Sequence, residues 1–244
     1  MIAIQTKNLT KKFEEKIAVD SLNLSIEQGE LFALLGVNGA GKTTTIKMLT
    51  CLCRPTDGDA ILLGSSIIAN PHAVKEKINV SPQETAVAPN LSVKENLELI
   101  AQIYGFNKKT VDIKVEEMLR TFGLTEVYKS KAKTLSGGMQ RRLSIAMALI
   151  TNPQILFLDE PTLGLDVIAR RELWTAIEKL KGSITIILTT HYMEEAEELS
   201  DRIGIMAKGK LKAVGTAVEL MAMTNTESLE NAFVSLATKE EVVR

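Results

Sequence analysis

A glycine-rich turn that ends in a lysine and a threonine is the segment of this sequence with the clearest chemistry. The turn directly follows an apolar run at residues 30–35, and we expect a helix after it that continues through Ile46 and Leu49. Glycines let the backbone curl so that successive N–H groups point inward at an anion, and the helix start adds about half a positive charge. The sequence therefore predicts a phosphate loop. Its residues are Gly36, Val37, Asn38, Gly39, Ala40, Gly41, Lys42 and Thr43.

The end of the phosphate loop carries side chains suited to a nucleoside triphosphate. We expect Lys42 to reach the β- and γ-phosphates and the hydroxyl of Thr43 to bind Mg²⁺. The next residue, Thr44, is expected at the α-phosphate. A chance match in a glycine-rich turn is the alternative, but the strand expected before the turn and the helix expected after it favour a nucleotide site.

Two carboxylates end the second apolar run, at residues 154–158. A carboxylate at the end of an apolar strand is costly to desolvate unless a cation compensates it, so Asp159 is predicted to anchor Mg²⁺, directly or through its ligands. Glu160 would face the γ-phosphate and polarise the attacking water as a general base. Acidic residues also occur where an ordinary strand passes into a loop, which is the alternative. The presence of the phosphate loop in the same chain favours the catalytic interpretation of this pair.

The third apolar run, at residues 184–188, leads to one of only two histidines in the chain. His191 would lie at the carboxyl edge of a parallel sheet, where ligands of such folds bind, and we predict that it contacts the γ-phosphate. A purely structural histidine is the alternative. Gln83, which is unremarkable by itself, could coordinate Mg²⁺ and the attacking water. The predicted catalytic residues are therefore Glu160, His191 and Gln83, and the predicted metal ligands are Thr43, Gln83 and Asp159.

The elements that position these residues follow from the pattern of apolar side chains. Three continuous apolar runs, with helical stretches between them, are typical of central strands buried on both faces of a parallel sheet. Residues 1–28 and 57–68 indicate an antiparallel β layer beside it, and residues 84–150 a helical lobe. Residues 225–244 indicate an amphipathic tail, which packs on its own domain or docks on a partner. We expect a single α/β domain over residues 1–244.

Composition narrows the class of protein. The chain has 244 residues, of which 45% are hydrophobic, and this fraction is enough for a large core. Its net charge of −1 differs from the strongly positive charge of a dedicated nucleic-acid binder. Cys51 and Cys53 complete neither a disulfide framework nor a zinc site. We expect neither a signal peptide nor a membrane span, because the longest apolar runs are far short of about 20 residues. Any link to a membrane is expected to come through another protein.

One further string identifies a family. Before the helix that precedes Asp159, the chain reads Leu135-Ser136-Gly137-Gly138-Met139-Gln140, here called the signature turn. With it, the chain resembles the ATP-binding cassette (ABC) transporter ATPases over essentially its full length. The motifs follow in family order: the phosphate loop, Gln83, the signature turn, Asp159-Glu160, Gly164-Leu165-Asp166 and His191. The resemblance implies a P-loop NTPase fold of the ABC ATPase type, with a mainly parallel core sheet, an antiparallel β subdomain and a helical lobe.

The resemblance also implies a shared site for ATP and Mg²⁺. In this family two subunits pair head to tail, so that each ATP lies between one phosphate loop and the signature turn of the other subunit. Ser136 and Gly138 would then contact the γ-phosphate held by the partner, Gly137 would belong to the same ATP-binding turn, and Asp166 would help to join the two sites. Phe13 matches the position where the family stacks a ring on adenine, although tyrosine is commoner there.

Finer details resemble the ATPase subunits of drug, antibiotic or ion exporters, notably residues 139–143 and 191–197. The chain would then energise an integral membrane subunit from the cytoplasmic face of the membrane. An ABC-type ATPase acting on nucleic acid or the ribosome is the first alternative, but such proteins usually carry two cassettes or a long coiled-coil insertion. A GTPase or small-molecule kinase is the second, yet Asn107-Lys108-Lys109-Thr110 lacks the aspartate of a guanine reader. Cargo and the choice between identical and different paired subunits stay open.

Overall fold

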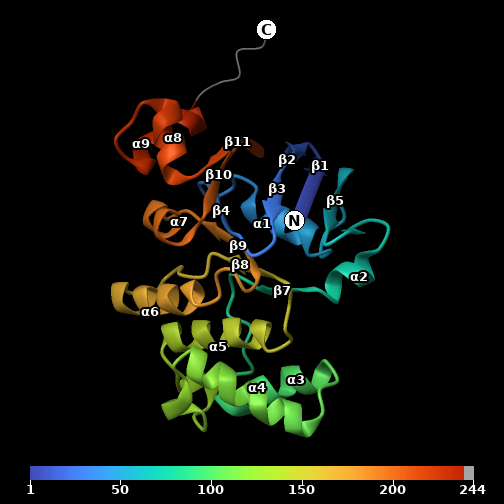
Figure 1. Cartoon of the computed structure of the whole chain (residues 1–244), viewed down its shortest axis with the longest axis vertical. Helices are drawn as coiled ribbons and strands as arrows, with labels where there is room; N and C mark the ends of the chain where they lie inside the picture. The colour runs from blue at the N-terminus through green and yellow to red at the C-terminus, as the bar shows by residue number, and fades with distance from the viewer. Residues whose placement is uncertain (239–244) are drawn as a thin grey trace.

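Six strands form the central sheet of the computed structural model, which describes residues 1–238 (Figure 1). They are β4 (Leu31–Leu35), β7 (Ile78–Ser81), β8 (Ile155–Asp159), β9 (Thr185–Thr190), β10 (Arg202–Ala207) and β11 (Lys210–Gly215). Their order across the sheet is β11-β10-β4-β9-β8-β7, and every pairing is parallel except that of β11 with β10. The parallel core predicted from the sequence is therefore confirmed.

The three apolar runs become β4, β9 and β8, which lie side by side in the sheet. The apolar pattern does not reveal the other strands. In β7, Asn79 and Ser81 alternate with Ile78 and Val80, and this strand pairs with β8 at the edge of the sheet. In β10, Gly204 interrupts the apolar residues. Central strands that are buried on both faces can be predicted from their apolar composition. Peripheral strands form through pairing with neighbouring strands, and their own sequences do not indicate this pairing.

A second, antiparallel sheet forms the β subdomain. Its strands are β1 (Ile2–Phe13), β2 (Lys16–Leu22), β3 (Ser25–Glu27), β5 (Asp57–Leu62) and β6 (Ser65–Ser66). The order is β2-β1-β5-β6, with β3 also paired to β1. β1 is longer than the short strands expected here, and irregularities in its pairing let this one strand bend along both β2 and β5. The hairpin between β1 and β2 carries Phe13 at its tip.

Three helices build the helical lobe: α3 (Val93–Ile103), α4 (Lys108–Thr121) and α5 (Gly137–Leu149), with short 3-10 turns at Thr125–Val127 and Ala132–Thr134. Polar side chains start each helix, because Ser92, Asn107 and Ser136 each accept a hydrogen bond from a backbone N–H of the first turn. The lobe lies at the end of the molecule opposite α8 (Ala217–Thr224) and α9 (Leu229–Thr238) (Figure 1).

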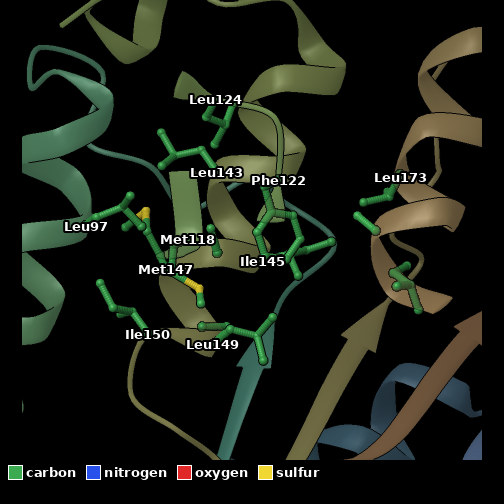
Figure 2. Close-up of a cluster of buried hydrophobic side chains, with 14 of the residues drawn as sticks. Leu97, Met118, Phe122, Leu124, Leu143, Ile145, Met147, Leu149, Ile150 and Leu173 are labelled. Carbon is green, nitrogen blue, oxygen red and sulfur yellow. The ribbon is translucent and has the colours of Figure 1, made fainter. Parts of the chain in front are cut away.

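The lobe is not a separate core. Figure 2 shows Leu97 of α3, Met118 of α4 and Phe122 packed around the side chains of α5, with Leu173 of α6 (Val167–Glu178) close by. The same cluster continues into the sheet through Leu156 and other strand residues. Packing of α5 therefore joins the lobe to the strands that carry the carboxyl-edge residues.

The remaining helices cover the sheet elsewhere: α1 (Lys42–Leu49), α2 (Pro71–Lys75) and α7 (Met193–Leu199), together with α8 and α9. Leu229 and Phe233 of α9 pack against Ile203 and Ile205 of β10. The part of the expected tail that the structure describes thus packs on its own domain, and residues 239–244 lie outside the described residues. Within residues 1–238, no helix combines the length and apolarity needed to cross a bilayer.

Candidate active site

A cavity of about 420 Å³ opens at the carboxyl edge of the central sheet. Most residues predicted from the sequence line it: Phe13, Asn38, Gly39, Ala40, Gly41, Lys42, Thr43, Thr44, Gln83, Glu160 and His191. They meet there because β4, β7, β8 and β9 run parallel, so that the segments following all four strands emerge at one edge. Lys16, Ala18 and Leu163 also line the cavity and were not predicted.

The phosphate loop is held by close backbone approaches that exclude side chains. A Cβ at Gly36 would lie 2.5 Å from the carbonyl oxygen of Met206. Gly41 has a φ of +109°, and a Cβ there would lie 2.5 Å from the carbonyl oxygen of Ala18. Glycine is therefore required at both ends of the curl, and the loop passes directly into α1. Its backbone N–H groups and the start of α1 make an anion site.

Lys42 places its ammonium inside the protein rather than in solvent. Nζ donates a hydrogen bond of 2.7 Å to the carbonyl oxygen of Gly36 and lies 3.0 Å from Oε1 of Glu160. Both side chains of this ion pair are buried. A buried cation that faces the cavity can hold the negative charge of a phosphate strongly, because little water screens it.

Asp159 and Thr43 form an oxygen-rich corner beside this pair. Asp159 Oδ1 accepts hydrogen bonds from Thr43 Oγ1 at 3.1 Å and from Thr189 Oγ1 at 2.6 Å. Mg²⁺ prefers oxygen ligands and is usually bound by one or two carboxylates together with substrate phosphates. The hydroxyl–carboxylate pair fits that chemistry, and Gln83 lines the same cavity as an exposed residue.

Both carboxylate oxygens of Glu160 have partners. His191 Nδ1 is hydrogen-bonded to Glu160 Oε2, while Lys42 pairs with the other carboxylate oxygen. The backbone of Glu160 has a φ of +50°, in the left-handed region that non-glycine residues rarely adopt, and its N–H donates to the carbonyl oxygen of Thr189. Strain of this kind, which costs on the order of 1–3 kcal/mol, is typical of functional sites. The carboxylate is thus aimed into the cavity.

The signature turn lies elsewhere. Ser136 and Gly137 are exposed, and the Ser136 hydroxyl accepts from the N–H of Met139 at 3.2 Å, which caps α5. None of Ser136, Gly137, Gly138 and Asp166 lines the cavity of its own chain. Asp166 is likewise exposed and caps α6 through the N–H of Ala169.

The starts of α5 and α6 are in close contact. A Cβ at Gly138 would lie 2.8 Å from Cβ of Ala169, so the glycine lets the two helices meet. The structure thus separates the predicted site residues into two groups on one chain: a cavity with its phosphate loop, and an outward-facing pair of helix starts.

Arg141 is a functional candidate that sequence reasoning missed. It is only 4% exposed, and its guanidinium donates to the carbonyl oxygens of Pro82, Gln83, Asp159 and Pro161. Burial lowers the pKa of Arg141 to about 10. A signal was available: helical spacing places Arg141 on the buried face of α5, four residues before the core residue Ile145.

Glu195, on α7, is a second buried ionisable group behind the site. Its side chain is completely buried, and its Oε1 accepts a hydrogen bond of 3.1 Å from Trp174 of α6. Burial raises the pKa of Glu195 above its ordinary value of 4.5, and hydrogen bonding offsets part of this effect. The side chain therefore joins α7, which follows His191, to α6, which follows Asp166.

A glycine loop on a helix start, a buried lysine and a paired acid at the edge of a parallel sheet define a nucleotide-binding protein of the P-loop class. The family model of the ABC transporter matches residues 19–163, which is more than half of the chain. The chain belongs to the ABC transporter family.

Curated relatives resemble this chain over most of its length. Phospholipid-transporting ATPase ABCA3 of Homo sapiens is 42% identical over 221 residues, which are 89% of this chain and 13% of that protein. Probable multidrug ABC transporter ATP-binding protein YbhF of Escherichia coli is 38% identical over 96% of this chain and 41% of its own length. Daunorubicin resistance ATP-binding protein DrrA3 of Streptomyces coeruleorubidus is 38% identical over 93% of this chain and 72% of its own length. The chain thus spans less than half of the first two of these relatives.

Solved structures confirm the ABC ATPase fold. An ATP-binding subunit of an ABC transporter superimposes with a TM-score of 0.85 at 28% identity, covering 96% of this chain and 99% of that one. A dimeric, post-hydrolysis state of the ATP-binding cassette MJ0796, bound to ADP and Pi, gives a TM-score of 0.77 at 28% identity. The superposition covers 87% of this chain and 98% of that one.

Proposed function

We propose that this chain is the ATP-binding and ATP-hydrolysing subunit of an ABC transporter of the exporter type, and that residues 1–244 act as one ATPase domain. The observation that carries the proposal is the convergence of Lys42, Glu160 and His191 on one cavity beside the phosphate loop. The names of the multidrug and daunorubicin-resistance relatives support export.

The side chains in the cavity divide the work of hydrolysis. Lys42 and the N–H groups of the phosphate loop hold the β- and γ-phosphates, and Thr44 the α-phosphate. Glu160 accepts a proton from the attacking water, and its carboxylate is oriented by Lys42 on one oxygen and His191 on the other. Mg²⁺, held by Thr43, Gln83 and Asp159, would neutralise charge on the phosphate oxygens.

Adenine is expected to stack on Phe13, whose ring is half-exposed at the mouth of the cavity. The ammonium of Lys11 lies 4.9 Å from the centre of this ring and also donates to the carbonyl oxygen of Arg54. The cation steadies the ring from one side and leaves the other available for a base.

The second half of each ATP site comes from another subunit. Ser136, Gly137 and Gly138 do not line their own cavity, and the first two are exposed, so we propose that this turn contacts the γ-phosphate bound by a second copy in a head-to-tail dimer. Asp166 lies beside them at the start of α6 and would join the two sites. The dimeric form of the similar cassette MJ0796 supports this arrangement.

A separate membrane-spanning subunit is the proposed target of the energy. We propose that it docks between the Gln83 segment and the helical lobe, which places the chain at the cytoplasmic face of the membrane. Gln83 lies both in the wall of the cavity and next to the carbonyl contacts of Arg141, so it can respond to the nucleotide and to the lobe. Dimer closure around ATP would move the membrane subunit, and hydrolysis would reopen the pair.

Replacing Glu160 with glutamine tests the proposed base. The variant should bind ATP with unchanged affinity, hydrolyse it about a hundredfold or more slowly, and accumulate as an ATP-dependent dimer in gel filtration. Glu178→Gln, an exposed residue at the end of α6, is the matched control and should behave like the unmodified chain. Normal turnover by Glu160→Gln would refute the base assignment, and an unmodified protein that binds no ATP would refute the function itself.

A further inference from the structure

Arg141 is an unusual cation because its hydrogen-bond acceptors within the described residues are all backbone carbonyl oxygens. Nε donates to Pro161 and Nη2 to Asp159, both at 2.8 Å, while Nη1 donates to Pro82 and Gln83. A buried guanidinium is costly to desolvate, and carbonyl dipoles compensate its charge less well than a carboxylate would. A side chain kept at such a cost is a candidate for a specific task.

Two of these bonds bracket Glu160. The carbonyl oxygens of Asp159 and Pro161 belong to the residues immediately before and after it, and one guanidinium binds both. Glu160 itself holds a φ of +50°, a strained conformation for a non-glycine residue that the surrounding structure must maintain. The two flanking hydrogen bonds fix the ends of this strained residue and thereby the direction of its carboxylate.

The other two bonds hold the segment that presents Gln83. Arg141 lies on α5, five residues after Ser136, which is about 7.5 Å along the helix axis. Because α5 is continuous from Gly137 to Leu149, we expect a displacement of the signature turn to be transmitted along the helix to the guanidinium and to the carbonyl groups that it binds. The signature turn is thus connected to the hydrolytic residues of its own chain.

We propose that Arg141 is a positioning residue for Glu160 and Gln83, and that it couples the signature turn, which engages the ATP of the second subunit, to hydrolysis in its own site. This inference rests on the proposed function. It explains why the guanidinium binds carbonyl groups on both sides of the strained acid: a rigid, branched donor can span four acceptors, whereas an ammonium cannot.

Two substitutions separate positioning from simple packing. Arg141→Lys keeps the charge without the planar fork, and Arg141→Gln keeps some hydrogen-bonding capacity without the charge. We expect kcat to fall about ten- to hundredfold in both, because a small misplacement of a catalytic group has such an effect, with the ATP dissociation constant and KM changed less than about threefold. Arg120→Lys, an exposed arginine of α4, is the control and should leave kcat unchanged.

Thermal melting of each variant is measured first. A cooperative transition followed by unchanged kcat would overturn the proposal, and so would loss of a folded state in both Arg141 variants, since the side chain would then serve folding alone. Equal losses in kcat and in ATP affinity would also overturn it.

A double variant tests the route through Glu160. If Arg141 acts by positioning this carboxylate, adding Arg141→Lys to Glu160→Gln should slow the residual hydrolysis by less than about threefold, because the group being positioned is already disabled. Multiplying losses would show that Arg141 does not act through the carboxylate of Glu160 and would overturn its assignment as the positioning residue for that group. Slow Glu160→Gln with normal Arg141→Lys refutes only the inference, whereas normal Glu160→Gln refutes the proposed base.

Discussion

The phosphate loop and the signature turn are two glycine-containing helix starts with opposite settings. The loop lies at the carboxyl edge of the sheet, where Lys42 is buried, Glu160 and His191 line the cavity, and Asp159 is hydrogen-bonded to Thr43 of the cavity wall. The turn exposes Ser136 and Gly137, and the Ser136 hydroxyl accepts a hydrogen bond from the N–H of Met139 in its own helix. The chain therefore contains one nearly complete half of a nucleotide site and displays the second half outward.

The difference in charge between the two regions suggests an order of binding. The phosphate loop offers an ammonium, whose hydrogen bond to an anion contributes about 1.5–3 kcal/mol. The first turn of α5 contains only neutral residues, so the signature turn offers N–H groups and a helix dipole worth about 0.3–1 kcal/mol at a surface. ATP should therefore bind to the loop first and recruit the turn of a second copy afterwards.

The largest effect should come from removing the core that supports the signature turn. Phe122 is fully buried among the helices of the lobe, and Phe122→Ala should lower the free energy of unfolding by about 3–5 kcal/mol through lost packing and a cavity. Because the same cluster reaches β8, we expect one cooperative transition rather than separate melting of the lobe. Urea denaturation followed by circular dichroism and by the fluorescence of Trp174 measures both.

Ile113→Ala, on an exposed face of α4, is the control for this change and should alter stability by less than about 1 kcal/mol. Two separate transitions in the Phe122 variant would show that the lobe folds independently. The two regions would then be coupled only through their motion.

The next effect tests whether loop and turn act across two copies. Lys42→Ala should weaken ATP binding about ten- to hundredfold, and Ser136→Arg should disable the site that its own signature turn completes while leaving ATP binding to its own loop intact. Mixing equal amounts of the two inactive proteins should restore about a quarter of the normal rate, because about half of the dimers are mixed and each has one intact site. ATPase titrations at varied mixing ratios measure the recovery.

Lys47→Ala, on the exposed side of α1, is the control for loss of a lysine from the same helix. A flat response at every mixing ratio would indicate that loop and turn serve the same copy. The comparison between an inward and an outward half-site would then be wrong.

The phosphate loop, the two acids and the histidine could be predicted because each lies at the end of a strand with continuous apolar residues. Such a strand can be recognised from its own sequence, without knowing which strands pair with it. Phe32, for example, is buried on one face of β4 and Leu31 on the other. Because both faces are buried, the strand is a continuous apolar run and not an alternation of apolar and polar residues. Gathering the residues at one cavity required only that these strands run parallel. The fold class was predictable for the same reason.

Arg141 was not predictable in this way. Its partners lie between 18 and 59 residues away in the sequence, and all of them are carbonyl groups, which every residue has. Lys16 was missed because its place at the cavity depends on the hairpin that carries Phe13. Contacts that depend on the backbone leave no residue type to recognise, and the structure is needed to find them.

The smallest effect concerns Glu195, which connects the two regions from behind by tying α7 to α6. Its pKa is raised by burial, so the folded chain binds more protons than the unfolded chain once the pH exceeds the ordinary value of 4.5. Stability is therefore lost as the pH rises from 4.5 through the raised pKa, and the loss is complete above it. Glu195→Gln, which keeps the acceptor for Trp174 without the charge, should melt about 2–4 °C higher than the unmodified chain above this window.

Below pH 4.5 the advantage of Glu195→Gln should no longer change with pH, because the carboxyl is then protonated in both states. Glu194→Gln, the exposed neighbour, is the matched control and should show no such dependence. Melting temperatures recorded between pH 4 and 8 test the sign directly. A variant that is less stable than the unmodified chain at pH 8 would mean that Glu195 is held as a charged carboxylate, balanced by the nearby Arg141, and that one buried ion pair rather than a neutral acid links the two regions.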